Sequence, residues 1–119
     1  MSEISRYFSR KEFACHCGCG YDTVDAELLT VLEDIREVFG LPVRILSGAR
    51  CNTHNATIDH SSISSRHLVA KAADITVKSI SHKSVQSYLL DKYPGKYGIG
   101  CYGTFTQIDV RTIPGRWSR

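Results

Sequence analysis

Hydrophobic side chains recur at spacings of three and four between residues 25 and 39, and this period predicts the main helix of the chain. The residues on its apolar face are Leu28, Leu29, Leu32, Ile35 and Phe39. Asp22 and Thr23 precede the helix and are residue types that cap helix N-termini. Gly40 is expected to end it, and Pro42 discourages its continuation. We therefore expect this helix to carry much of the core.

Two further helices are predicted from capping residues. Ser9 and Glu12 have the Ser-x-x-Glu spacing of a capping box, which indicates a short helix beginning there. Ser81 is expected to cap another helix, with apolar residues at helical spacing until Pro94 stops it.

Four strands are expected between these helices and after them. Residues 43–46 are predicted to form a strand leading into a Ser47-Gly48 turn, and residues 73–77 alternate as a strand does. Residues 97–102 and 105–110 are expected to pair through a turn at Gly103. Residues 51–66 are rich in Asn, Thr, Ser and His and are expected to form a long loop that walls a site. The pattern predicts one α+β domain over residues 1–119, with a small, mainly antiparallel sheet and helices packed on one side.

Composition and charge exclude several classes of protein. Hydrophobic residues make up 42% and charged residues 23% of 119 positions, which is typical of a globular domain. The net charge is +3 without a dense run of Lys and Arg, so we expect no nucleic-acid partner. No segment approaches the roughly 18 apolar residues of a membrane helix, and the first residues lack the apolar core of a signal peptide, so we expect no membrane partner.

The five cysteines leave three interpretations open. Cys15, Cys17 and Cys19 are separated by single residues, whereas zinc knuckles normally use Cys-x2-Cys spacing. We expect disulfides to Cys51 or Cys101, or buried thiols, in preference to a second metal site.

His67 and Asp74 lie seven positions apart and supply ligand types that zinc accepts. A catalytic zinc usually takes three protein ligands and keeps one position open for water. These two residues would supply two of the three.

Several motifs resemble the zinc peptidases of the D-alanyl-D-alanine carboxypeptidase and L-alanyl-D-glutamate endopeptidase family, which includes bacterial enzymes and phage lysins. The motifs are Ser47-Gly48-Ala49-Arg50, Ser65-Arg66-His67, Ala72-Ala73-Asp74 and Thr106-Gln107-Ile108-Asp109. Ala70 stands where the family usually has glycine. The resemblance implies a Hedgehog/D,D-peptidase-like fold, Zn²⁺ as cofactor, and His67 and Asp74 as two of its ligands.

The resemblance places the third ligand, usually His, at Gln107. A neutral amide oxygen binds zinc more weakly than imidazole does. Three explanations remain open: Gln107 binds the metal through oxygen, it replaces a natural histidine to inactivate a lysin, or the protein is a binding module without catalysis. His16, His54, His60 and His82 are candidates for a substitute ligand, although solvated or hydrogen-bonded imidazoles are the favoured interpretation.

Three more residues receive roles. Asp109 is expected on the same strand face as Gln107, as general base or as support for a ligand, with an ion pair to Arg111 as the alternative. The resemblance makes Arg50 the residue that binds substrate and stabilises the oxyanion, although an isolated arginine is more often a surface charge. Ser65 is expected to orient its loop near the substrate.

The sequence predicts a zinc metallopeptidase that hydrolyses peptide bonds of bacterial peptidoglycan, as a carboxypeptidase or an endopeptidase. The alternative is a catalytically silent domain, wall-binding or structural, from a phage or bacterium. The expected place of action is the bacterial cell wall. Without a signal peptide, the protein would stay in the cytoplasm until release or travel in a virion. The bond that is cut and the oligomeric state are left open.

Overall fold

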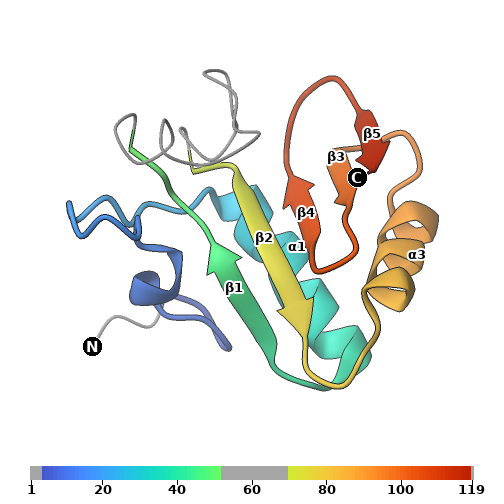
Figure 1. The fold of residues 1–119 in the computed structure, drawn as a ribbon, viewed down its shortest axis with the longest axis horizontal. Helices are drawn as coiled ribbons and strands as arrows, with labels where there is room; N and C mark the ends of the chain where they lie inside the picture. The colour runs from blue at the N-terminus through green and yellow to red at the C-terminus, as the bar shows by residue number, and fades with distance from the viewer. Residues whose placement is uncertain (1–3, 52–69, 119) are drawn as a thin grey trace.

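The fold is a five-stranded sheet with two α-helices, in a computed structural model that describes residues 4–51 and 70–118 (Figure 1). The helical elements are the 3-10 helix η1 (Arg10–Phe13), α1 (Ala26–Phe39) and α3 (His82–Lys92). The strands are β1 (Val43–Ser47), β2 (Ala72–Val77), β3 (Gly98–Cys101), β4 (Thr106–Asp109) and β5 (Gly115–Ser118). Neither α-helix is long and apolar enough to cross a membrane within this described part.

The strands lie in the order β1-β2-β4-β3-β5. The pairs β1–β2, β2–β4 and β3–β4 are antiparallel, and β3–β5 is parallel. The predicted α+β class with a mainly antiparallel sheet is therefore confirmed. The sequence did not predict β5, because Gly-Arg-Trp-Ser has little apolar alternation and acquires its strand form by pairing with β3.

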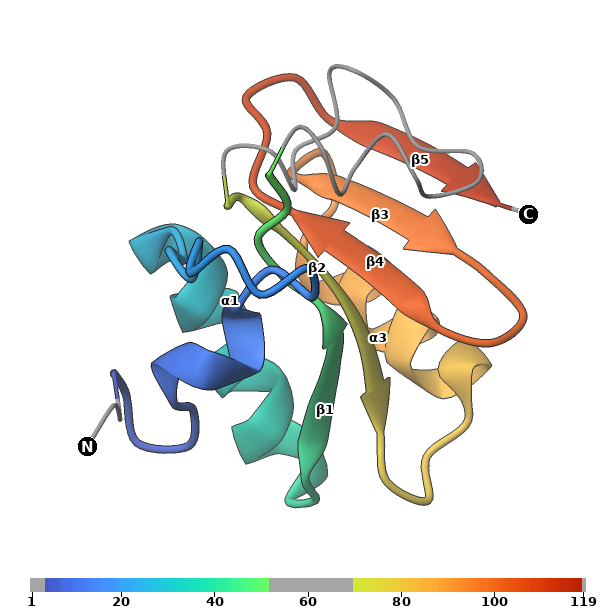
Figure 2. The ribbon, with the colours of Figure 1, turned by 60° about the vertical axis from the view of Figure 1, so that its left-hand side comes forward.

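Both α-helices lie on one side of the sheet (Figure 2). Ile75 of β2 and Ile108 of β4 are fully buried and pack with Leu28 and Leu32 of α1 and Leu89 of α3. Because side chains alternate along a strand, the neighbours of Ile75 and Ile108 project to the opposite face. The core therefore leaves one face of β2 and β4 for other chemistry.

The N-cap residue of α1 differs from the prediction. Asp25, and not Asp22 or Thr23, caps the helix, accepting hydrogen bonds from the backbone nitrogens of Glu27 (2.8 Å) and Leu28 (3.2 Å). The backbone N–H of Asp25 also donates to the carbonyl of Ala70 at 2.9 Å, which fixes the start of the helix beside β2.

The remaining predicted helices and strands are present within about two residues of their expected ends, whereas the loop predicted over 51–66 lies, except for its first residue, outside the described residues. Gly40 ends α1 in the left-handed conformation, with φ of 67°. The short helix at Ser9 is a 3-10 turn, in which the carboxylate of Glu12 accepts the Ser9 backbone N–H at 2.7 Å. Ser81 caps α3 through the backbone N–H of Ser84 at 3.1 Å.

Candidate functional site

The register of β2 and β4 places Asp74 directly opposite Gln107. Directly opposed residues of neighbouring strands have their side chains on the same face, and Asp109 shares that face because it lies two positions beyond Gln107. This is the face turned away from the buried Ile75 and Ile108. Three of the residues predicted for the site thus gather on one face of the sheet.

Arg50 reaches Asp74 from the segment that follows β1. Its Nη2 lies 3.2 Å from Asp74 Oδ2, and its Nε donates to the hydroxyl of Ser47 at 3.2 Å. Arg50 is 6% exposed and Asp74 7% exposed, so the pair is buried. Burial lowers the pKa of Arg50, whereas the neighbouring charges of Asp74 and Cys15 raise it. The guanidinium stays protonated, and it is fixed beside the predicted carboxylate ligand.

Asp109 is held by a bidentate ion pair. Arg111 donates from Nε to Oδ1 and from Nη2 to Oδ2, both at 2.7 Å, and Asp109 is fully buried. Gln107 Nε2 lies 3.4 Å from Asp109 Oδ2. Gly98 faces this carboxylate across the β3–β4 pair, where a Cβ atom would collide with Oδ1. The geometry favours the supporting role for Asp109, and its role as general base stays a prediction.

The contact with Asp109 also orients Gln107. With its amide nitrogen turned toward Asp109, the amide oxygen is the atom that Gln107 offers as a ligand. Asp74 and Gln107 together present two oxygen donors on adjacent strands.

Four other predicted residues, His67, Ser65, His54 and His60, fall in the 52–69 segment, outside the described residues. His16 is exposed in the cysteine-rich loop. His82 is the first residue of α3, which packs on the core side of the sheet, and it is half-buried. Neither of these two described histidines lies on a strand of the Asp74 face.

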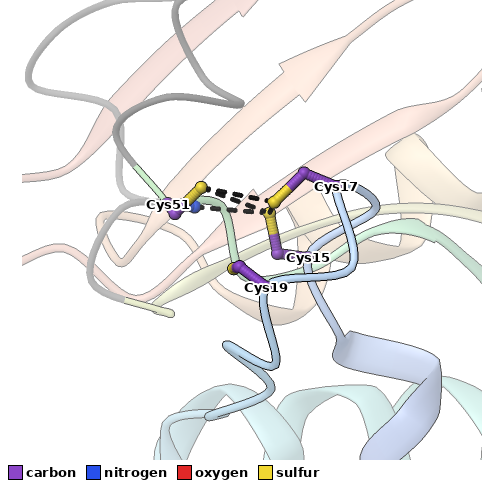
Figure 3. Close-up of side chains that lie close together, drawn as sticks. All are labelled: Cys15, Cys17, Cys19 and Cys51. Atoms are coloured by element: carbon purple, nitrogen blue, oxygen red, sulfur yellow. Dashed lines mark hydrogen bonds between the residues drawn. The ribbon is translucent and has the colours of Figure 1, made fainter.

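The structure also brings together a group of residues that was not favoured from the sequence. Cys15, Cys17, Cys19 and Cys51 place their sulfur atoms within 4.8 Å of one another (Figure 3). Burial raises the pKa of Cys15, but hydrogen bonds from the backbone N–H groups of Cys17 and Cys51 outweigh it and lower this pKa to about 7. None of the five cysteines, all of which lie in the described part of the chain, forms a disulfide, and Cys101 lies outside the cluster on β3.

The disulfides expected to Cys51 or Cys101 are thus not formed. Gly18 and Gly20 adopt positive φ of 83° and 92°, a conformation that glycine takes at little cost, and so allow the sharp turns between these closely spaced cysteines. The spacing of the first three cysteines was the available signal, and the fourth is separated from Cys15 by 36 positions.

Comparisons with known proteins support the motif resemblance. Neither the curated proteins nor the solved structures gave a match. One family model, described as Peptidase M15, matches residues 6–109, from the segment before η1 to the last residue of β4. Because this match covers most of the chain, the protein belongs to the peptidase M15 family.

Proposed function

We propose that this protein is a zinc-dependent peptidase that hydrolyses peptide bonds of bacterial peptidoglycan. The observation that carries the proposal is the pairing of Asp74 with Gln107 across β2 and β4, with Arg50 at 3.2 Å from Asp74. Membership of a peptidase family supports hydrolysis of a peptide bond. The peptidoglycan substrate rests on the resemblance of the motifs.

The donor set fits zinc in type. Asp74 would bind through a carboxylate oxygen, Gln107 through its amide oxygen, and His67 through imidazole nitrogen. When bound, zinc supplies a water nucleophile at neutral pH and polarises the scissile carbonyl. Gln107 is the weakest of the three donors, so we expect modest zinc affinity and low activity.

The described side chains near Asp74 and Gln107 have separate roles in this proposal. Arg50 holds Asp74 in place, and its buried guanidinium can offset negative charge on the substrate's carbonyl oxygen or bind a substrate carboxylate. Asp109 holds the Gln107 amide so that its oxygen is the ligand atom. Because both Asp109 oxygens accept from Arg111, this carboxylate acts as an anchor rather than as a free proton acceptor.

A catalytically silent wall-binding domain is the second candidate. Gln107 favours it, because loss of the imidazole would leave the substrate-binding Arg50 in place while weakening the metal. The buried Arg50–Asp74 ion pair also keeps the site charge-balanced without a cation. Both candidates therefore predict binding to peptidoglycan, and only the first predicts hydrolysis.

The test compares three variants with the unmodified protein in zinc-containing buffer. Amino groups released from purified peptidoglycan are measured for Gln107→His, Asp74→Asn and Asp91→Asn. Asp91 is exposed on α3, so Asp91→Asn controls for the loss of a carboxylate away from the site. We expect Gln107→His to raise hydrolysis about tenfold or more, as a stronger ligand should, Asp74→Asn to abolish it, and Asp91→Asn to leave it unchanged.

Two results would contradict the peptidase proposal or its assignment of ligands. If Gln107→His is folded and sediments with peptidoglycan yet releases no amino groups at any zinc concentration, the peptidase proposal is wrong and the silent binder is correct. Hydrolysis that persists in Asp74→Asn would show that Asp74 is not a ligand.

A further inference from the structure

We propose that Cys15, Cys17, Cys19 and Cys51 bind a structural zinc ion through four thiolates. This site is separate from the predicted catalytic one and would not take part in hydrolysis. Its role would be to fasten the N-terminal segment to the stretch that carries Arg50.

The spacing of the sulfur atoms matches a tetrahedral metal site. Sγ–Sγ distances are 3.5 Å for Cys15–Cys17, 3.8 Å for Cys15–Cys51 and 3.5 Å for Cys17–Cys51. A zinc ion with Zn–S bonds of about 2.3 Å in tetrahedral geometry requires sulfur atoms about 3.8 Å apart. A disulfide instead requires about 2.05 Å. The convergence of all four sulfur atoms on one point is therefore better explained by a shared ligand than by pairwise bonds.

The backbone around the cluster is folded to support it. Gly18 donates its N–H to the carbonyl of Cys15 at 3.2 Å, and Cys15 donates to the carbonyl of Tyr21 at 2.7 Å, so that the loop closes on itself. The N–H of Cys51 points at Cys15 Sγ from 3.4 Å. Hydrogen bonds from backbone N–H groups to ligand atoms are a usual feature of the surroundings of metal sites.

The four ligands come from two segments of the chain. Figure 3 shows three of them on the N-terminal loop and Cys51 on the stretch that follows β1. These segments also touch beneath the cluster, where Ala49 donates to the carbonyl of Phe13 at 2.8 Å. Gly48 allows this approach, because a Cβ there would lie 2.8 Å from Phe13 Cα. A metal ion bound by all four cysteines would therefore add a second link between two segments that already share a backbone hydrogen bond.

Zinc is the ion that fits best. Four thiolates in tetrahedral arrangement select zinc or iron among the common metals. Because Cys17 and Cys19 are exposed, a bound ion would be open to oxidants, and zinc, unlike iron, does not change its oxidation state. On binding, the cysteines that still carry a thiol proton release it to solvent, and Zn²⁺ with four thiolates carries a net charge of −2. Arg50, the residue that precedes Cys51, is positively charged and would offset part of this charge.

The position of the cluster connects it with Arg50. Cys51 is the next residue after Arg50, whose side chain reaches Asp74 at 3.2 Å. Fixing Cys51 to the N-terminal loop restricts the backbone on which Arg50 is carried. Removal of the metal should therefore loosen Arg50 as well as the N-terminal segment.

The test uses the full chain, purified under reducing conditions and loaded with Co²⁺ in place of Zn²⁺. Thiolate ligands produce intense sulfur-to-cobalt charge-transfer absorption in the near ultraviolet, which oxygen and nitrogen ligands do not. The variants are Cys17→Ser, an exposed ligand, and Cys101→Ser, a cysteine on β3 outside the cluster. We expect the charge-transfer band in the unmodified protein and in Cys101→Ser, and its loss or marked weakening in Cys17→Ser.

Thiol counting provides a second readout that does not depend on any variant folding. In the zinc-loaded unmodified protein, we expect about one rapidly reactive thiol per chain, and five after a chelator is added. Absence of the charge-transfer band at saturating Co²⁺, or five reactive thiols before chelation, would overturn the proposal. Asp74→Asn should keep the band, so failure of the catalytic site and failure of the cysteine site are distinguished.

Discussion

Replacing Arg111 with methionine would leave the carboxylate of Asp109 buried without its cation. Asp109 is fully buried and accepts two hydrogen bonds of 2.7 Å from Arg111, whose side chain is 24% exposed. Removing one partner of a buried ion pair costs about 3–5 kcal/mol, and because Arg111 is partly exposed we expect a cost of about 3 kcal/mol here. Methionine keeps an apolar contact with the Trp117 ring, on which Arg111 packs at 4.8 Å.

Thermal and urea unfolding followed by circular dichroism measure this loss. For a chain of this length, about 3 kcal/mol corresponds to a fall in Tm of about 12 °C. Arg6→Met is the matched control, because Arg6 pairs with Glu37 at 3.7 Å and the two side chains are 75% and 54% exposed. An exposed pair contributes about 0–1 kcal/mol, so the control should lower Tm by a few degrees at most.

The double variant Asp109→Asn with Arg111→Met separates the buried charge from general loss of packing. Removing the carboxylate charge should restore part of the stability that Arg111→Met loses, because a neutral amide costs less to bury than an unpaired carboxylate. The reasoning would be refuted if Arg111→Met were no more destabilising than Arg6→Met. It would also fail if the double variant were less stable than Arg111→Met alone.

Two more predictions concern the sheet edge and alkaline pH. Gly100→Ala would place a Cβ 2.5 Å from Trp117 Nε1, so we expect a loss of about 1–3 kcal/mol in urea unfolding and a shifted tryptophan emission, whereas Gly103→Ala, with nothing within 4 Å, should cost little. Burial and a hydrogen bond to Glu27 raise the pKa of Tyr97 to about 12, from about 10 in the unfolded chain. The unfolded state therefore loses its proton first, and this contribution to stability, complete below about pH 10, should disappear as the pH rises toward about 12. Urea midpoints measured across this range should fall less steeply in Tyr97→Phe, and an equal slope would contradict the assignment.

Local signals were sufficient for most of the elements. The three-to-four period of Leu28, Leu32 and Ile35 identified α1, because that period is imposed by packing one helix face on a core. Alternation identified β2, and Gly40 and Ser81 marked helix ends through chemistry confined to a few neighbouring residues. These signals need no knowledge of the rest of the chain.

The features that the sequence did not predict all depend on contacts between distant parts of the chain. Asp22 and Asp25 are both acceptable caps in sequence, and Asp25 is selected because its backbone N–H reaches the carbonyl of Ala70. Strand β5 exists through pairing with β3. Cys51 reaches Cys15 across 36 positions. In each case a contact between segments far apart in sequence decides the outcome.

The candidate site shows the same division. Motif resemblance named Asp74, Gln107 and Asp109, but only the strand register shows that Asp74 and Gln107 are direct partners. The alternative role of Asp109, an ion pair with Arg111, could be predicted because the two residues are close in sequence. That the carboxylate is completely buried, so that loss of Arg111 should be costly, is a property of the folded sheet.

The two proposed metal sites meet at the segment that ends β1 and continues to Cys51. Ser47 accepts from Arg50, Arg50 binds Asp74, and Cys51 belongs to the sulfur cluster. A total zinc content of one ion per chain is consequently compatible with occupation of either site. Because four thiolates outcompete a set that contains a neutral amide, the cysteine site should fill first. Zinc bound to the unmodified protein would then report on the cysteines, and only a second equivalent, or hydrolysis that depends on residue 107, reports on the catalytic site.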